Sequence, residues 1–102
     1  MEIERLKMNN QQQQVQIRAS DPDLKGVYSN VAMVTHTQEE FVIDFMNIVN
    51  NAGVLASRVI LGPGHFKRLI KALQDNLKNY EDKFGSVTPA EPPKQDIGFG
   101  PR

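Results

Sequence analysis

The segment NVAMVTHTQEEFVIDFMNIV, residues 30–49, carries apolar residues on both faces of the hairpin that it predicts. Two runs rich in valine, isoleucine and phenylalanine flank a polar segment, which is typical of two antiparallel strands joined by a short turn. If the turn is centred on Gln38 and Glu39, His36 lies opposite Phe41. Both faces of such a sheet need cover, and this requirement limits the folds open to the chain.

Side chains alternate along a strand, so this register assigns every apolar residue of the hairpin to one of two faces. The first face carries Tyr28, Ala32, Val34, Phe41, Ile43 and Phe45. The second face carries Val27, Val31, Met33, Val42, Met46 and Ile48, with Asp44 among them.

The surrounding sequence predicts two more strands and one helix. The four predicted strands are residues 15–19, 27–37, 41–49 and 54–61. DPDLKG at 21–26 and NNAG at 50–53 read as turns, because their aspartates, asparagines, proline and glycines favour tight backbone bends. Beyond GPG at 62–64 the spacing changes to steps of three and four, typical of one helical stripe ending at Gly85. The stripe comprises Phe66, Leu69, Ile70, Leu73, Leu77, Tyr80 and Phe84.

The predicted fold class is α+β: a four-stranded antiparallel sheet followed by one long C-terminal amphipathic helix packed on one face. The chain of 102 residues has room for one domain, which we place at 15–85. A polar N-terminal tail at 1–14 and a Pro/Gly-rich tail at 86–102 are expected to be disordered or flexible. In the second tail only Ile97 and Phe99 are candidates for anchors of a docking motif.

One helix covers one sheet face, so the second face predicts a further partner. A second copy of the chain is the simplest partner and would give a homo-oligomer. One alternative is a different strand register, which would redistribute the apolar residues between the faces. The other is an apolar face that stays open to bind client chains. The predicted oligomer face comprises Val31, Met33, Val42, Asp44, Met46, Ile48 and Arg58. Asp44 on this face needs a cation, and Arg58 is the predicted partner, within the subunit or across the interface. The alternative is an acid or base with a raised pKa.

Catalytic and metal-binding groupings are not evident in the sequence. It contains no cysteine, and its two histidines, His36 and His65, are far apart. Ser29 and Ser57 lack the glycine-flanked turn of a nucleophile elbow. We therefore expect neither an enzyme nor a metal or cofactor. No apolar run approaches the length of a membrane span, and a cytoplasmic location without membrane contact is the expectation.

The start of the predicted helix concentrates positive charge. Gly64, His65, Lys67, Arg68 and Lys71 follow the GPG turn, where cations oppose the helix dipole unless an anion binds. One interpretation is an anion or nucleic-acid contact at these residues. The other is a solvent face whose cations pair with Asp75 or with acids in loops.

A long joint pattern resembles a family of short bacterial and archaeal proteins, the domain-of-unknown-function family 3467. The pattern extends from LKGVYSN through HTQEEFVIDF to ASRVILGPGHFKRLIKALQDNLKNYEDKFG, about residues 15–85. Gly62 departs from the small hydroxyl residue usual before the proline, which weakens a helix-cap role there. The resemblance implies a fold and a cytosolic setting, and no activity or site residue.

Three functions remain open at this point. The first is a non-enzymatic homo-oligomeric module that binds another protein. The second is a single-stranded nucleic-acid-binding protein that uses Lys67, Arg68 and Lys71 with Tyr28 or Phe41 as stacking residues. Against it, residues 15–85 contain eight basic and eight acidic residues. The third is a holdase resembling the SecB export chaperone.

Overall fold

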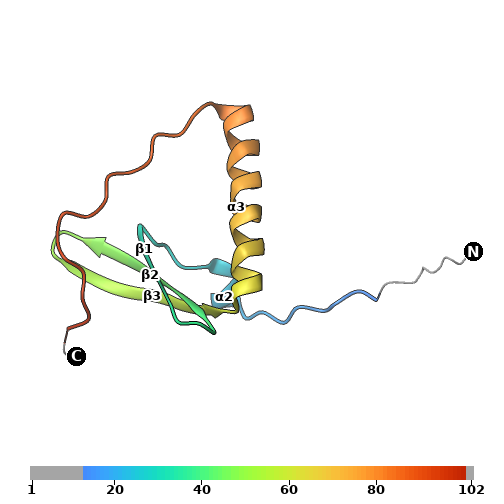
Figure 1. The fold of residues 1–102 in the computed structure, drawn as a ribbon, viewed down its shortest axis with the longest axis horizontal. Helices are drawn as coiled ribbons and strands as arrows, with labels where there is room; N and C mark the ends of the chain where they lie inside the picture. Colours follow the sequence, from blue (N-terminus) through green and yellow to red (C-terminus); the bar gives the residue numbers. More distant parts are fainter. Residues whose placement is uncertain (1–12, 101–102) are drawn as a thin grey trace, which may run out of the picture.

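The computed structural model describes residues 13–100, which form one three-stranded sheet, one short helix and one long helix (Figure 1). In chain order the elements are α2 (Asp21–Lys25), β1 (Val31–His36), β2 (Phe41–Val49), β3 (Ala52–Leu61) and α3 (Pro63–Phe84). Strand β2 lies in the middle and is antiparallel to both neighbours. The α+β class and the C-terminal helix are confirmed.

The hairpin of β1 and β2 has the predicted register, with His36 opposite Phe41. The backbone N–H of Thr37 donates to the carbonyl of Glu40, and the Thr37 hydroxyl accepts from the N–H groups of Glu39 and Glu40. These bonds satisfy the polar backbone of a turn that has no strand partner.

The register defines two sheet faces that are used below. The Phe41 face carries Ala32, Val34, Phe41, Ile43 and Phe45, with Val59 and Leu61 from β3. The Asp44 face carries Val31, Met33, Val42, Asp44, Met46 and Ile48, with Leu55 and Arg58 from β3. A bulge at Phe45 and Met46 shifts the pairing with β3, so Met46 lies opposite Leu55. The predicted separation of the apolar residues into two faces is confirmed for β1 and β2, whereas Val27 and Tyr28, which were also assigned to these faces, precede β1.

Strand β1 begins at Val31 and not at the predicted residue 27, because side chains take over the pairing before it. The Asn30 side chain donates to the carbonyl of Ile48 at 2.8 Å and accepts from the N–H of Ile48 at 2.9 Å. The Ser29 hydroxyl lies 2.9 Å from the carbonyl oxygens of both Val31 and Met46. An amide side chain that replaces a backbone pair ends the ladder there.

The prediction of a fourth strand at 15–19 is wrong. These residues have no strand partner in the described part of the chain, and Val15 and Ile17 are largely exposed. The predicted turn at 21–26 is a single helical turn, α2, closed by a capping box between Ser20 and Asp23. Short apolar strands need a neighbour to bury them, and this capped turn directs the chain away from the sheet edge.

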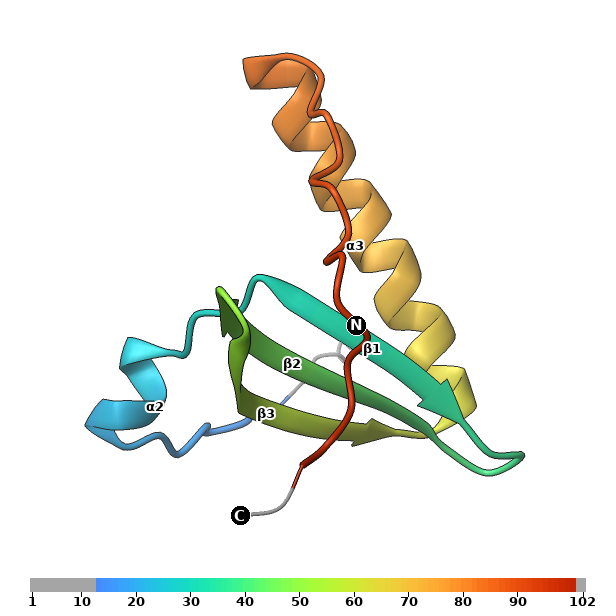
Figure 2. The same cartoon turned by 90° about the vertical axis from the view of Figure 1, so that its left-hand side faces the viewer.

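The prediction that the helix packs across one sheet face is also wrong. Helix α3 has 22 residues and buries none of them. Figures 1 and 2 show it rising from one edge of the sheet and pointing away from it. The Cα radius of gyration is accordingly 19.0 Å, against about 13 Å for a compact chain of 100 residues. The tight turn at Gly62 fixes this direction, because Leu61 ends β3 and Pro63 already starts the helix.

The core of the described residues is small. Ile43 and Leu61 are buried on the Phe41 face, and Met46 and Asp44 are buried on the Asp44 face. Phe41 joins the sheet to the helix, because its ring stacks on Phe66 with centroids 4.0 Å apart and planes 4° apart. This stack holds the first turn of α3 against the sheet.

The segment after α3 returns to the sheet. Gly85, with φ +98°, ends the helix, and residues 85–100 form no helix or strand. Figure 2 shows this red segment crossing in front of the sheet. Residues 1–12 of the predicted N-terminal tail lie outside the described residues.

Candidate interaction surfaces

The paired charges on the Asp44 face come from adjacent strands. Asp44 on β2 lies directly opposite Arg58 on β3. The Arg58 Nε donates to Asp44 Oδ1 at 2.6 Å, and Nη2 donates to Oδ2 at 3.0 Å. The carboxylate is buried and the guanidinium is half exposed. The structure therefore places the predicted partner of Asp44 within the same chain.

The environment of Asp44 opposes the hypothesis of a raised pKa. The hydrogen bonds from Arg58 lower the pKa of the Asp44 carboxyl, overcoming the opposite effect of desolvation, and the same bonds raise the pKa of Arg58. Both groups are charged at neutral pH. A carboxylate that accepts two hydrogen bonds from Arg58 stays ionised near neutrality, which favours a structural role for this pair over acid–base chemistry.

This pKa shift predicts acid sensitivity. The folded-state pKa of Asp44 lies below the ordinary 3.8, so the unfolded state binds more protons as pH falls through that window. The stabilisation from the pair is complete above the ordinary value and is lost as pH decreases toward the folded-state pKa.

Urea denaturation at pH 7, 5 and 3 tests this. Asp44→Asn should lose less free energy of unfolding between pH 5 and pH 3 than the wild type. The control Asp75→Asn changes an exposed pair and should keep the wild-type slope. Equal slopes for wild type and Asp44→Asn would contradict the prediction.

The basic residues at the start of α3 are all exposed, and two of them meet side-chain partners on the same helix. An Arg68 nitrogen lies 3.1 Å from His65 Nδ1. Lys71 contacts both carboxylate oxygens of Asp75 at 3.2 Å, as the solvent-face interpretation predicts. Gly62 provides no side-chain cap, and the first turn of α3 carries no acid. Gly64 and Lys67 lie among these exposed residues.

The two proposed base-stacking residues differ in availability. Tyr28 is exposed, in the segment before β1. Phe41 already stacks on Phe66 and lies 5.3 Å from the His36 ring. Phe66 covers one face of the Phe41 ring and His36 lies close to it, so Phe41 is less available to a base than Tyr28.

The described part of the chain contains neither a cluster of metal ligands nor a membrane-spanning helix. Residues 13–100 contain no group of three histidine, cysteine or acidic side chains placed to hold a metal ion. The helices among them include none with the length and apolar character to cross a bilayer.

The Asp44 face contacts the C-terminal segment. Gln95 Nε2 donates to Asn51 Oδ1 at 3.0 Å, and the Arg58 guanidinium lies 5.5 Å from the centre of the Phe99 ring. Ile97 is half buried, whereas its neighbours are exposed. The sequence marked Ile97 and Phe99 as anchors by their apolar character, and their target on the chain's own sheet was missed.

Comparison with known proteins places the chain in a family. The family model described as protein of unknown function (DUF3467) matches residues 1–88. The chain belongs to this family. The match confirms the resemblance seen at residues 15–85 and also includes the N-terminal segment. No curated protein and no solved structure matches this DUF3467 chain. Its function therefore has to be argued from its surfaces.

Proposed function

We propose that this DUF3467 protein is a homo-oligomeric protein-interaction module whose subunits associate through the apolar stripe of α3. The observation that supports this most directly is the exposure of that stripe. Ile70, Leu73, Leu77, Tyr80 and Phe84 are between 41% and 66% exposed. A monomer rarely exposes a contiguous apolar patch beyond a few hundred Å².

The total surface is large for a monomer, and the exposed segments 13–20 and 85–100 contribute to it together with α3. The chain exposes 8971 Å², whereas a compact monomer of this mass exposes about 5,800 Å². Helix α3 contributes to this excess because it buries no residue against its own sheet. An amphipathic helix gains most of its stability in water from tertiary packing of its apolar face.

The spacing of the stripe suits a helical partner. Six of its residues alternate in steps of four and three, which is the a/d pattern of a coiled coil. This seam comprises Phe66, Ile70, Leu73, Leu77, Tyr80 and Phe84. The ion pairs Lys71–Asp75 and Lys78–Asp82 occupy the opposite side of the helix. The helix thus has one apolar side and one charged side.

Charge complementarity favours a second copy in antiparallel orientation. In the heptad of this seam, Lys67 and Glu81 both occupy e positions. An antiparallel pair that packs Leu73 of one copy against Leu77 of the other places Lys67 of each copy next to Glu81 of its partner, twice per dimer. A parallel pair places Glu81 beside the neutral Asn76 and leaves Lys67 without an acid. The antiparallel arrangement is two-fold symmetric, as a closed dimer requires.

The oligomer face predicted from the sequence stays a prediction, and the structure lends it less support than α3. Met46 and Asp44 on that face are already buried within the chain, and the C-terminal segment lies over part of it. From Ile70 to Phe84 the stripe of α3 has no such cover, and only Phe66 at its start is stacked on the sheet.

Light scattering on the purified full chain tests the association. We expect the wild type to have twice the chain mass and Leu77→Asp to be a folded monomer, because a charge on the seam loses its solvation in the pair. The control Ala72→Asp introduces the same group at an exposed position outside the seam and should remain dimeric. A wild-type monomer, or a Leu77→Asp dimer, would contradict the proposal. A wild-type monomer that binds an apolar dye would point instead to a client-binding face.

Charge reversal tests the orientation. Lys67→Glu and Glu81→Lys should each weaken the dimer, and the double variant should regain much of the lost affinity. Residues 67 and 81 lie about 21 Å apart along one helix, too far for a contact within a subunit. Recovery can therefore arise only between subunits. Additive losses in the double variant would exclude the antiparallel arrangement.

A further inference from the structure

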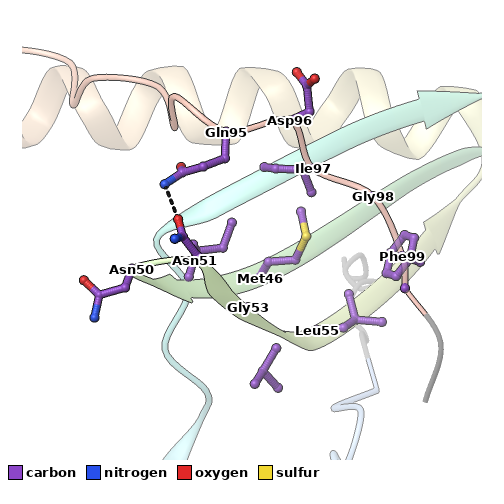
Figure 3. A pocket seen from close by; sticks show the side chains of 13 residues that line it. Met46, Asn50, Asn51, Gly53, Leu55, Gln95, Asp96, Ile97, Gly98 and Phe99 are labelled. Atoms are coloured by element: carbon purple, nitrogen blue, oxygen red, sulfur yellow. Dashed lines mark hydrogen bonds between the residues drawn. The ribbon is translucent and has the colours of Figure 1, made fainter.

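The C-terminal segment and the Asp44 face enclose a cavity of about 470 Å³ (Figure 3). Met46, Ile48 and Leu55 line it from the sheet, and Ile97 and Phe99 line it from the segment. Figure 3 shows the Met46 side chain pointing toward the C-terminal segment that carries Ile97. The Gln95–Asn51 hydrogen bond closes one end, at the turn between β2 and β3.

The spacing of the two anchors explains how an extended segment binds here. Side chains two residues apart in an extended chain lie on the same side. Ile97 and Phe99 therefore meet the sheet together, with Gly98 between them. Arg58 joins the sheet to the C-terminal segment, because its guanidinium is bound by Asp44 and lies 5.5 Å from the centre of the Phe99 ring. The ion pair thus presents an oriented cation to an aromatic side chain.

The fit of the segment is incomplete, which makes it displaceable. Phe99 stays 63% exposed, and the cavity beneath the segment is not filled by side chains. Between Val87, whose N–H donates to Glu81, and Gln95, no hydrogen bond holds the chain within the described residues. The anchors are tethered by residues 86–94, which include three prolines, so they return to the groove at an effective concentration of about millimolar.

We propose that the Asp44 face is a peptide-binding groove whose occupant is the chain's own segment 95–99, bound in cis through Ile97 and Phe99. The groove accepts an extended peptide with an aliphatic side chain and an aromatic side chain two residues apart. Any partner with that pattern has to displace the C-terminal segment first. This groove lies on the sheet and does not depend on the association of α3.

A fluorescent reporter on the full chain tests the contact. The chain has no tryptophan, so Phe99→Trp introduces a single one at the anchor. We expect its emission to be blue-shifted relative to the same residue in a free peptide. Adding Leu55→Ser, in the groove wall, should move the emission toward that of the free peptide. The control Val34→Ser changes an exposed valine on the Phe41 face and should leave the emission unchanged. Emission like that of the free peptide in Phe99→Trp itself would overturn the proposal.

Competition tests the groove as a binding site. A fluorescein-labelled peptide of residues 91–100 should bind the full-length variant Ile97→Ser/Phe99→Ser about tenfold more tightly than the wild type, whose groove is occupied in cis. A peptide with both serines should not bind. Equal affinity for wild type and variant would overturn the cis occupant.

The Phe99→Trp reporter in the Leu77→Asp background separates this inference from the proposed function. A blue shift that persists there supports occupancy within one chain, whatever the oligomeric state. A blue shift that appears only in the dimer would assign the segment to the groove of a second copy and would overturn the cis contact.

Discussion

Met46→Asp is expected to destabilise the protein strongly, and the reason lies in how few side chains form its core. Met46 is 5% exposed, lies on the same strand face as the buried Asp44, and lines the groove under segment 95–99. Aspartate at 46 removes an apolar side chain from the core and the groove and adds a second carboxylate beside Asp44, a loss of about 2–4 kcal/mol. A small domain has about 5 kcal/mol in total. Far-UV circular dichroism and urea denaturation at a fixed protein concentration measure the loss.

Two comparisons make this result specific. Met46→Leu keeps the volume and the apolar character, and should cost less than about 1.5 kcal/mol. Leu77→Asp places the same charge on the exposed stripe of α3 and should dissociate the protein while leaving it folded. A Met46→Asp variant that stays folded and becomes monomeric would contradict this account and would return the interface to the Asp44 face.

The second large effect concerns the contact between sheet and helix. Phe41→Ala should lower the free energy of unfolding by about 2–3 kcal/mol, because Phe41 stacks on Phe66 and contacts His36. No other stacked ring pair joins α3 to the sheet within residues 13–100. Urea denaturation followed by circular dichroism measures the loss.

A double-mutant cycle isolates the stacking contribution. Phe41→Leu and Phe66→Leu keep apolar volume and remove one ring each, and the coupling free energy should be about 1 kcal/mol. Tyr80→Leu is the matched control, because Tyr80 contacts Phe84 within α3 and not the sheet. It should show no coupling to Phe41→Leu. Additive effects of the Phe41 and Phe66 substitutions would show that α3 is held by other contacts.

The small contact between the sheet and α3 leaves surfaces where partners can bind. The sheet and α3 are joined at one corner, so two surfaces remain for association: the α3 seam and the groove under segment 95–99. From Ile70 to Phe84 the seam is uncovered in the single chain, whereas the groove carries a loosely fitted occupant. The two proposals together describe an interaction module with one surface for its own copy and another that a partner reaches by displacement.

The sequence alone determined the local structure of this protein. Alternation of side chains predicted β2 at the residues where it occurs, and the turn residues predicted the pairing of His36 with Phe41. The three–four spacing and Gly85 predicted the helix and its end. The need of a buried carboxylate for a cation predicted the Asp44–Arg58 pair. Each of these features depends on neighbours close in the chain or directly opposite in a hairpin.

Only the tertiary structure decided how the elements cover one another. Strand-like alternation at 15–19 did not produce a strand, because a strand forms only where the chain path pairs it with a sheet edge, and this segment has no such partner. The direction of α3 followed from the abrupt turn at Gly62, and its spacing would have been the same in a helix packed on the sheet. The contact of Ile97 and Phe99 with the Asp44 face joins residues more than 40 positions apart. Apolar character predicts that such side chains seek cover, and the path of the chain decides which face provides it.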